Sequence, residues 1–412
     1  MRKLEMFTRA YPSGFKAKVI QRPNFYKKFM GIIVDFGGSD PQSLSGGAHF
    51  LEHKLYAKKT GDISQKIEAL NATTNAFTSY NETMFYVEFL EHWRQVLPLL
   101  FELVGTTHFT QENIAKEAKI ISQELAMYQD DPSWQVSHDL LGKMFPKSKL
   151  AEDLTGTQTS LQEMTPQILS EIYQKNYYSG NLEFVACGGF SDNQAKSILR
   201  EVGKLQKQYF RNEKKQSIAE QAFTATTEKE SKIAGNVTIP LVGVGIKLPS
   251  FETLNSNLTK GQIQILIEMM LEARLGSSSS WFENSQKSGL VDIPLSISVT
   301  YTRQGNFAII SGSTHNPDDL VIQIKQQIKF GRIVASNFDL QKKNFISNSI
   351  RELDQVENLA IEEAEYSLDN ESRSKLYQKI QTLSFSEFCE VYEEIVAKSD
   401  IFTTILESEN EK

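Results

Sequence analysis

The sequence predicts an α+β fold made of two tandem copies of one unit, each a mostly antiparallel sheet flanked by helices. Three observations lead to this prediction. The order strand, helix, strands, helix, long helix pair, strand occurs twice along the 412 residues. A polar, charge-mixed stretch at 206–234 separates the two copies, as a linker does. Apolar residues make up 40% of the chain and charged residues 23%, which is ordinary for soluble globular domains.

These observations place the domain boundaries. We expect a first domain at 1–205, a linker at 206–234 and a second domain at 235–412. The length of the chain allows two to four domains of about 100–200 residues, so each copy can bury a core of its own. The copies resemble each other in pattern rather than in residue identity.

In the first copy, runs rich in Thr, Phe, Tyr and Val mark the strands. Thr110 is a helix N-cap candidate with an acidic first turn, and Asp130-Asp131-Pro132 ends the helix that it begins. Strands are expected at 16–20, 29–36, 75–80, 83–89 and 181–190. Helices are expected over the stretch beginning at Gly47, at 63–70, 91–104, 110–128, 133–144 and 192–205.

The second copy repeats this order after the linker. Strands are expected at 236–248, 292–299, 306–312 and 402–406, and helices at 261–275, 340–353 and 356–368. The helix at 261–275 stands where the first copy has its histidine-bearing helix, but it carries only Gln and Glu as polar candidates. One copy is therefore expected to carry the chemistry and the other to act as scaffold.

The histidine-bearing helix is the strongest functional signal. Gly47 to Leu55 reads Gly-Ala-His-Phe-Leu-Glu-His-Lys-Leu, which contains the inverted zincin motif His-x-x-Glu-His. On a helix, His49 and His53 point from one face, so both rings can bind one zinc ion at about 2.0–2.1 Å. Glu52 lies over the same patch and can take a proton from the attacking water without being a ligand. Composition alone predicts about 0.01 such motifs here, which disfavours the alternative of two ordinary surface histidines.

A third protein ligand is expected because catalytic zinc sites use three protein ligands and a water. The helix that begins near Thr110 carries Glu117 and Glu124, which are two turns apart and therefore share one face. Apolar residues surround them, and a buried carboxylate needs a partner or a metal. We predict that Glu124 is the ligand and that Glu117 orients it or a histidine. The alternative is two acids on a solvated helix face.

Composition also argues against several classes of function. The net charge is −7 and no dense cluster of Lys and Arg occurs, which disfavours nucleic-acid binding. No run of 18 apolar residues exists, so no membrane span is expected. Residues 1–6 lack the apolar region of a signal peptide. With only two cysteines, both in apolar surroundings, we expect a cytoplasmic protein with buried thiols rather than a disulfide.

Several further motifs accompany the histidine-bearing helix. They are Asn75-Ala76-Phe77-Thr78, Glu117 and Glu124 followed by Met127-Tyr128, Gly61-Asp62 and Asp130-Asp131-Pro132. Together with the motif and its flanks, they closely resemble the M16, or insulinase/pitrilysin, family of zinc peptidases, and the resemblance covers essentially the whole chain. The chain looks most like a short bacterial branch of the family, in which Gly-Asp follows the motif and Asp-Asp-Pro closes the long helix.

The resemblance implies a role for each matching residue. His49, His53 and Glu124 would bind Zn²⁺, with Glu52 as the base and Glu117 as the supporting acid. The substrate-binding residues would be Asn75, Ala76, Phe77 and Thr78, on an edge strand that pairs with the peptide backbone. An exposed edge captures an extended peptide by main-chain hydrogen bonds, with little demand on side chains.

The chain also departs from the family pattern. The second half of family members usually carries an Arg and, seven residues on, a Tyr, which bracket a Gly-Leu and contact the scissile region. Here Gly289-Leu290 is present, but the Arg position is Ser285 and the Tyr position is Asp292. The two residues through which the second half of family members contacts the substrate are therefore replaced in this chain.

We expect a zinc-dependent endopeptidase that cleaves short or unstructured peptides in a closed chamber, in peptide maturation or processing. By the resemblance, a chain of this length needs a facing domain from another subunit. That partner is expected in a homodimer or in a heterodimer with a non-catalytic M16 paralogue, and the missing Arg and Tyr favour the heterodimer. The alternative is a metal-binding scaffold subunit of a peptide- or translation-factor-modification complex with little proteolytic activity.

Overall fold

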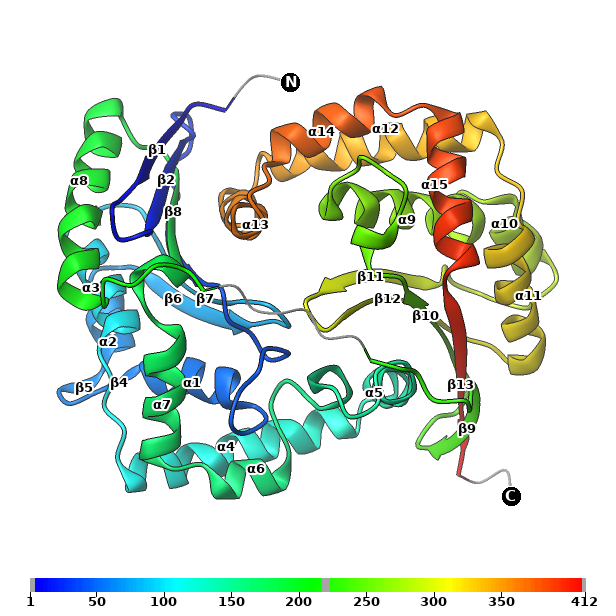
Figure 1. Cartoon of the computed structure of the whole chain (residues 1–412), viewed down its shortest axis with the longest axis horizontal. Helices are drawn as coiled ribbons and strands as arrows, with labels where there is room; N and C mark the ends of the chain where they lie inside the picture. Colours follow the sequence, from blue (N-terminus) through cyan, green and yellow to red (C-terminus); the bar gives the residue numbers. More distant parts are fainter. Residues whose placement is uncertain (1–3, 217–222, 410–412) are drawn as a thin grey trace. The chain divides into compact units, whose positions relative to one another are not determined.

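The computed structural model describes residues 4–216 and 223–409. These residues form two compact units, each built around its own sheet (Figure 1). Unit 1 holds 4–125, 153–216 and 349–373, and unit 2 holds 126–152, 223–348 and 374–409. Both units therefore draw on both halves of the chain.

Unit 1 contains a six-stranded sheet in the order β1-β2-β8-β3-β7-β6. Only β2 and β8 are parallel neighbours, and every other pair is antiparallel. The strands are β1 (Met6–Ala10), β2 (Lys16–Gln21), β3 (Lys28–Val34), β6 (Thr73–Thr78), β7 (Thr83–Phe89) and β8 (Leu182–Gly188). A separate two-stranded ribbon joins β4 (Ala57–Lys58) and β5 (Gly61–Asp62).

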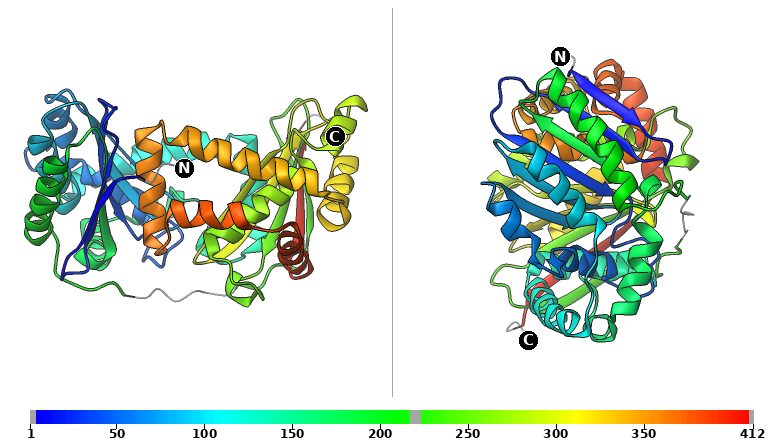
Figure 2. Two further views of the ribbon diagram at one scale, coloured as in Figure 1. Left: turned by 90° about the horizontal axis from the view of Figure 1, so that it is seen from above. Right: turned by 90° about the vertical axis from the view of Figure 1, so that its left-hand side faces the viewer.

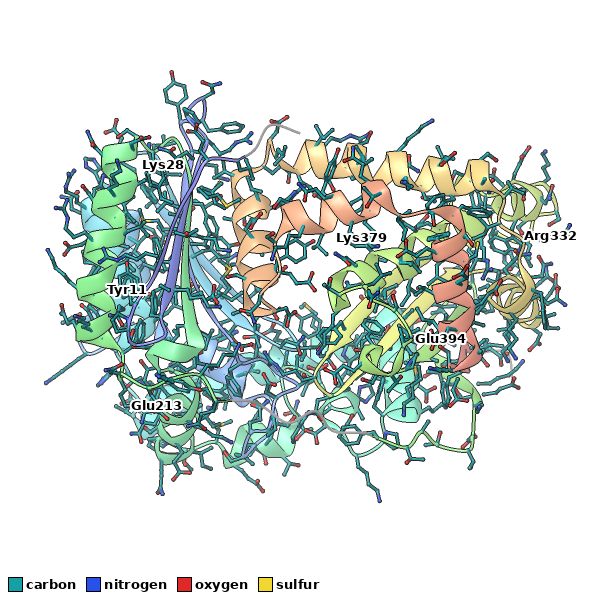
Figure 3. All side chains as sticks on the ribbon, turned by 45° about the horizontal axis from the view of Figure 1, so that its top comes forward. Tyr11, Lys28, Glu213, Arg332, Lys379 and Glu394 are labelled. Atoms are coloured by element: carbon teal, nitrogen blue, oxygen red, sulfur yellow. The ribbon has the colours of Figure 1, made fainter. Side chains whose placement is uncertain are left out.

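Helices cover both faces of this sheet (Figure 2). They are α1 (Gly47–Leu55), α2 (Ile63–Glu68), α3 (Trp93–Gly105), α4 (Gln111–Gln129), α6 (Gln158–Glu163), α7 (Pro166–Asn176), α8 (Asp192–Tyr209) and α13 (Val356–Leu368). The main core includes apolar side chains of α1, α3, α4 and α8, and α13 packs on the opposite face in a smaller cluster. Tyr11, labelled in Figure 3, donates its hydroxyl to the carbonyl of Leu199 and ties the β1–β2 turn to α8.

Unit 2 contains a five-stranded sheet in the order β11-β12-β10-β13-β9. Its strands are β9 (Glu230–Gly235), β10 (Leu241–Leu248), β11 (Ser296–Thr302), β12 (Gly305–Ser313) and β13 (Asp400–Ser408). Its helices are α5 (Pro132–Met144), α9 (Lys260–Leu275), α10 (Ser280–Lys287), α11 (Pro317–Phe330), α12 (Ala335–Glu352), α14 (Arg373–Thr382) and α15 (Phe385–Ala397). Helix α5 contacts β10 and β13, while α9 contacts β11 and α11 contacts β10.

Five strands of the first sheet have the same order and pairing as the five strands of the second, which confirms the predicted duplication and the α+β fold class. Reading from the edge nearest the motif helix, β6-β7-β3-β8-β2 corresponds to β11-β12-β10-β13-β9. The one parallel pair falls at the same place in both, β2 with β8 and β9 with β13. Helix α9 contacts β11 as α1 contacts β6. The elements of the second copy therefore follow those of the first.

The second helix of each long pair packs on the sheet of the other copy. Helix α5 follows α4 in the chain but contacts the second sheet, and α13 follows α12 but contacts β3 and β8 of the first. Gly243 and Gly245 in β10 allow the approach of α5, because a Cβ at Gly243 would lie 2.2 Å from the Val136 side chain. The Asp139 carboxylate on α5 accepts hydrogen bonds from Lys143, Ser231 and Thr404 at 2.6–2.7 Å, which fixes the helix on β9 and β13.

The two compact units therefore differ from the domains expected from the sequence. Those domains, 1–205 and 235–412 with a linker at 206–234, follow the order of the two copies along the chain. The stretch predicted as a linker contains the end of α8 and most of β9, because β9 pairs in parallel with β13 at the sheet edge. Residues 217–222 of that stretch lie outside the described residues. In the described part of the chain, no helix is both long and apolar enough to span a bilayer.

Candidate metal centre and peptide-binding edge

The motif helix α1 begins at a glycine pair that brings it into the core of unit 1. Gly46 precedes the helix with a φ of 76°, a left-handed conformation that side chains disfavour. A Cβ at Gly46 would also lie 2.4 Å from the Thr155 carbonyl oxygen. From this start, Phe50, Leu51 and Leu55 are fully buried, so the helix turns its histidine face toward α4.

Three side chains converge between α1 and α4. His49 Nε2 lies 3.8 Å from Glu124 Oε1, and His53 Nε2 lies 3.7 Å from Glu124 Oε2. The two imidazole rings are 4.6 Å apart between centroids. One donor atom from each residue fits within a 4.8 Å triangle, and no other such group occurs in residues 4–216 and 223–409. The structure thus brings together the three residues predicted as ligands.

Glu117 lies two helical turns before Glu124 on α4 and contacts the same centre. Its Oε1 lies 3.1 Å from His53 Nδ1, and its Oε2 accepts a hydrogen bond from Lys54 Nζ at 3.0 Å. Burial acts against the charged carboxylate, but the bonds to His53 and Lys54 outweigh it and lower the pKa of Glu117 to about 2. Because Glu117 occupies Nδ1, the Nε2 atom of His53 remains directed at Glu124.

The donor set fits a transition metal, and zinc in particular. Two imidazole nitrogens and one carboxylate are the ligands of many catalytic zinc sites, which keep a fourth position for water. Tetrahedral ligands at about 2.0–2.1 Å lie about 3.4 Å apart. The two distances from Glu124 to the histidine nitrogens, 3.7 and 3.8 Å, therefore need only a few tenths of an ångström of adjustment. Burial, together with the neighbouring His53, lowers the pKa of His49 to about 4. His49 is therefore neutral, as a ligand must be.

Glu52 lies on the same helix, between the two histidines in sequence. Its Oε2 accepts a hydrogen bond from Thr78 Oγ1 at 2.7 Å. Burial raises the pKa of Glu52, while the bond from Thr78 and the charge of His53 act in the opposite direction. A carboxylate with a raised pKa beside a metal site is suited to accept and return a proton near neutral pH.

Residues 73–78 form β6, and this strand is an edge of the first sheet. Among the described strands β6 pairs with β7 alone, in a register that joins Ala76 to Phe85 and Thr78 to Thr83. The backbone N–H of Ala76 donates to the side-chain oxygen of its own neighbour Asn75 at 2.9 Å rather than to a strand. The edge therefore presents a main-chain donor that a peptide could take over by displacing one side-chain contact.

The structure places the four residues predicted to bind substrate on two faces of β6. Asn75 and Phe77 lie on the side of α13, and Ala76 and Thr78 lie on the side of α1. The side chain of Asn75 is exposed, and its oxygen accepts the Ala76 N–H. Thr78 was predicted for its backbone, but its hydroxyl contacts the predicted base.

Sequence reasoning missed Lys54. This side chain is only 4% exposed and forms an ion pair with Glu117. Its place in the motif helix next to His53 is a usable signal, because a buried acid on the facing helix requires a cation or a proton. In the second copy, α9 offers Gln264 and Glu268, which hydrogen-bond each other, in place of the two histidines.

A duplicated α+β fold with two histidines from one helix, an acid from a second helix and a glutamate beside them is typical of zinc metallopeptidases. Two family profiles match the chain: "Insulinase (Peptidase family M16)" over residues 23–158 and "Peptidase M16 inactive domain" over residues 163–331. The chain belongs to peptidase family M16. The first profile contains the metal centre and the edge strand.

Several bacterial proteins are similar in sequence. The uncharacterized zinc protease YmfH of Bacillus subtilis is 27% identical over 399 residues, which cover 93% of this chain and 92% of that protein. The uncharacterized zinc protease ML0855 of Mycobacterium leprae is 24% identical over 196 residues, or 46% of this chain and 44% of that protein.

Solved structures share the fold along nearly the whole chain. An M16-like peptidase from Alicyclobacillus acidocaldarius superposes with a TM-score of 0.89 at 22% identity and covers 98% of both chains. A protease from Helicobacter pylori superposes with a TM-score of 0.80 at 16% identity and covers 98% of this chain and 100% of that one. At these identities the likeness establishes the fold.

Proposed function

We propose that this protein is a zinc-dependent endopeptidase that cleaves short or unstructured peptides. The observation that carries the proposal is the convergence of His49, His53 and Glu124 within a 4.8 Å triangle, beside Glu52 and the open edge of β6. Membership of a peptidase family and the names of similar proteins as zinc proteases support it.

His49, His53 and Glu124 would hold the zinc ion, and Glu117 would keep His53 in the required orientation through Nδ1. When bound, zinc supplies Lewis acidity at the scissile carbonyl and lowers the pKa of water toward about 7. Glu124 and the two histidines come from different helices, so α1 and α4 together define the centre.

Glu52 would act as general base and then as general acid. It takes the proton of the attacking water and passes it to the amine of the leaving fragment, which restores the carboxylate. Its position on the motif helix supports this role, since it adjoins His53 without being one of the three converging donors. Thr78 holds the carboxylate at 2.7 Å.

The edge of β6 would align the substrate. A peptide that pairs with β6 along its length must be extended, because a continuous series of main-chain hydrogen bonds along a sheet edge requires a partner in the strand conformation. Folded proteins rarely offer a free extended segment, so short or unstructured peptides are the expected substrates. Little side-chain selectivity is expected from Ala76 and Asn75, whose contacts with the peptide would be mainly polar and backbone-directed.

The Glu52→Gln variant tests the proposal. It should bind one zinc per chain with unchanged affinity and lose cleavage of a quenched peptide library by at least 100-fold, the low end of general-base contributions. Glu68→Gln, which changes an exposed acid on α2, is the matched control and should cleave like the wild type. Chelator should abolish cleavage, and zinc should restore it. Cleavage by Glu52→Gln at the wild-type rate would contradict the assignment of the base.

A second candidate is a metal-binding scaffold subunit with little proteolytic activity. It is favoured by Ser285 and Asp292, which occupy the positions where the family usually has Arg and Tyr. Ser285 is buried and its carbonyl accepts hydrogen bonds from Leu290 and Ser288, so it serves the α10 terminus. Full zinc occupancy without peptide cleavage would support this candidate. The closed chamber and the dimeric partner expected from the resemblance stay predictions, which sedimentation and co-purification from the native host would test.

A further inference from the structure

We propose that Thr78 is a positioning residue, which holds the Glu52 carboxylate in place and links it to the substrate edge of β6. The inference rests on the proposed function in one respect, the role of Glu52 as base. It differs from the expectation drawn from the sequence, in which Thr78 contributes only to peptide binding.

The first observation is the contact itself. Thr78 Oγ1 lies 2.7 Å from Glu52 Oε2, which is a normal distance for a hydroxyl donor and a carboxylate acceptor. Hydrogen bonds to charged acceptors are roughly twice as strong as neutral ones. Thr78 ends β6 and Glu52 lies on α1, so this bond joins the strand to the motif helix. A free carboxylate on a helix would otherwise choose among several rotamers.

The second observation is that the neighbouring hydroxyl of Thr83 determines which way the Thr78–Glu52 hydrogen bond runs. Thr83 is fully buried, and its Oγ1 donates to the carbonyl oxygen of Phe36 at 3.0 Å. Thr83 Oγ1 also lies 3.4 Å from Thr78 Oγ1. A hydroxyl can donate only one hydrogen bond, and Thr83 donates its hydrogen bond to the Phe36 carbonyl oxygen. Thr78 therefore accepts no hydrogen bond from Thr83, and its own hydroxyl donates to the nearer acceptor, the Glu52 carboxylate.

The third observation is the place of Thr78 in the sheet. It pairs with Thr83 at the end of the β6–β7 hairpin, two residues beyond Ala76, whose amide is available to a peptide. A peptide that adds to β6 would pair with the strand that carries Thr78. Capture of the peptide and placement of the base would therefore use the same strand. Because the peptide bonds to the backbone, removal of the hydroxyl should affect the chemical step rather than binding.

Substitution of Thr78 gives the test. Thr78→Val keeps the shape and removes the hydroxyl, and Thr78→Ser keeps the hydroxyl. With zinc-loaded protein and a quenched peptide, Thr78→Val should lower kcat about 10- to 100-fold, as misplacement of a catalytic group does, with KM within about twofold. Thr78→Ser should recover to within about threefold of the wild type. All variants should bind one zinc per chain.

Thr74→Val is the matched control. Thr74 lies on the same strand and face, but its hydroxyl donates to the Tyr86 carbonyl oxygen at 2.9 Å and lies 3.5 Å from the Tyr56 hydroxyl. It should leave kcat unchanged. Equal kcat for Thr78→Val and wild type would overturn the proposal. So would a fall in kcat that Thr78→Ser does not reverse, or a loss of zinc from Thr78→Val, because each indicates a different role.

Crystal structures supply a measurement that does not depend on cleavage. The Glu52 carboxylate should turn away from its position in Thr78→Val and keep it in Thr78→Ser. An unmoved carboxylate in Thr78→Val would overturn the proposal. If the wild type shows no chelator-sensitive cleavage, the proposed peptidase function fails, while the crystallographic comparison still decides the role of Thr78. Should Thr78→Val not fold, Thr78→Ala provides the same comparison.

Discussion

His53 Nδ1 lies 3.1 Å from Glu117 Oε1, and this contact directs the other ring nitrogen of His53 toward Glu124. The second oxygen of Glu117 bonds to Lys54, the next residue of the same helix. One carboxylate on α4 thus holds two consecutive side chains of α1. With its pKa lowered to about 2 by these partners against the effect of burial, Glu117 remains ionised at any working pH.

The first prediction concerns this contact. Glu117→Gln should fold normally but bind zinc about 10- to 100-fold more weakly, because the amide holds His53 and Lys54 less firmly. Competition with a chromophoric chelator measures the affinity. Glu112→Gln, an exposed acid in the first turn of the same helix, should bind zinc as the wild type does. Wild-type affinity in Glu117→Gln would show that Glu117 does not orient the ligand.

The second prediction concerns metal removal. Zinc binds only the folded site, so it should raise the midpoint of thermal unfolding, with about 2.7 kcal/mol of added stability at a concentration 100 times the dissociation constant. Chelator should remove this gain. His49→Ala should show none of it, whereas His315→Ala, an exposed histidine in unit 2, should show all of it. A zinc-dependent shift in His49→Ala would place the stabilising ion elsewhere.

The third prediction concerns pH. Burial, together with the neighbouring charges of Glu82 and Glu362, raises the pKa of Glu365 on α13 to about 8. A carboxyl whose folded pKa exceeds its unfolded value binds protons more tightly when folded, so its contribution is complete below the unfolded pKa and is lost as pH rises through about 8. The free energy of unfolding should therefore fall between pH 6 and pH 9.

Glu365→Gln should reduce that slope, since the amide cannot lose a proton. Urea unfolding at pH 6, 7.5 and 9, with zinc removed to exclude metal effects, measures it. Glu68→Gln on α2, which is exposed, should keep the wild-type slope. An equal slope in Glu365→Gln would assign the pH dependence to other groups, among them Asp40, whose burial raises its pKa to about 8.

The convergence of the candidate metal ligands could be predicted because it depends on local sequence spacing. The spacing of His49 and His53 and the seven-residue interval between Glu117 and Glu124 each follow from the helical period, and the structure brings all four together. The partner of Thr78 could not be predicted. Strand alternation assigns a face to a side chain, but the identity of the residue opposite depends on how α1 lies on the sheet.

The packing of α5 and α13, each on the sheet of the other copy, also could not be predicted. Each helix shows an apolar face, and that pattern says only that something covers the face. Val356, Leu359 and Ala360 pack against strands that precede them by more than 160 residues. The Asp139 network on α5 likewise depends on Ser231 and Thr404, which no motif connects. Contiguous boundaries are the natural expectation when only the order of elements is known.

The fourth prediction follows from the packing of α13. Leu359 is fully buried among side chains of the first sheet, so Leu359→Ala should destabilise unit 1 by about 2–5 kcal/mol. Leu340→Ala on α12 is the matched control, because Leu340 is 40% exposed, and it should cost much less. Denaturant unfolding measures both. Equal effects of the two substitutions would indicate that α13 does not form part of the core.

The last prediction uses fragments of the chain. A fragment of residues 1–218 lacks α13 and would expose Ile20, Ile33 and Met84, and a fragment of residues 223–412 lacks α5 and would expose β10 and β13. Each fragment alone should aggregate or show no cooperative unfolding, since an uncovered sheet face buries too little apolar surface. Co-expression should yield a soluble complex with one copy of each, because each then supplies the helix that the other lacks. Size-exclusion chromatography with light scattering gives the stoichiometry.

If the fragment of residues 1–218 alone were monomeric and unfolded cooperatively, α13 would be dispensable for the first sheet. The packing of α13 on that sheet would then not be required for the folded core.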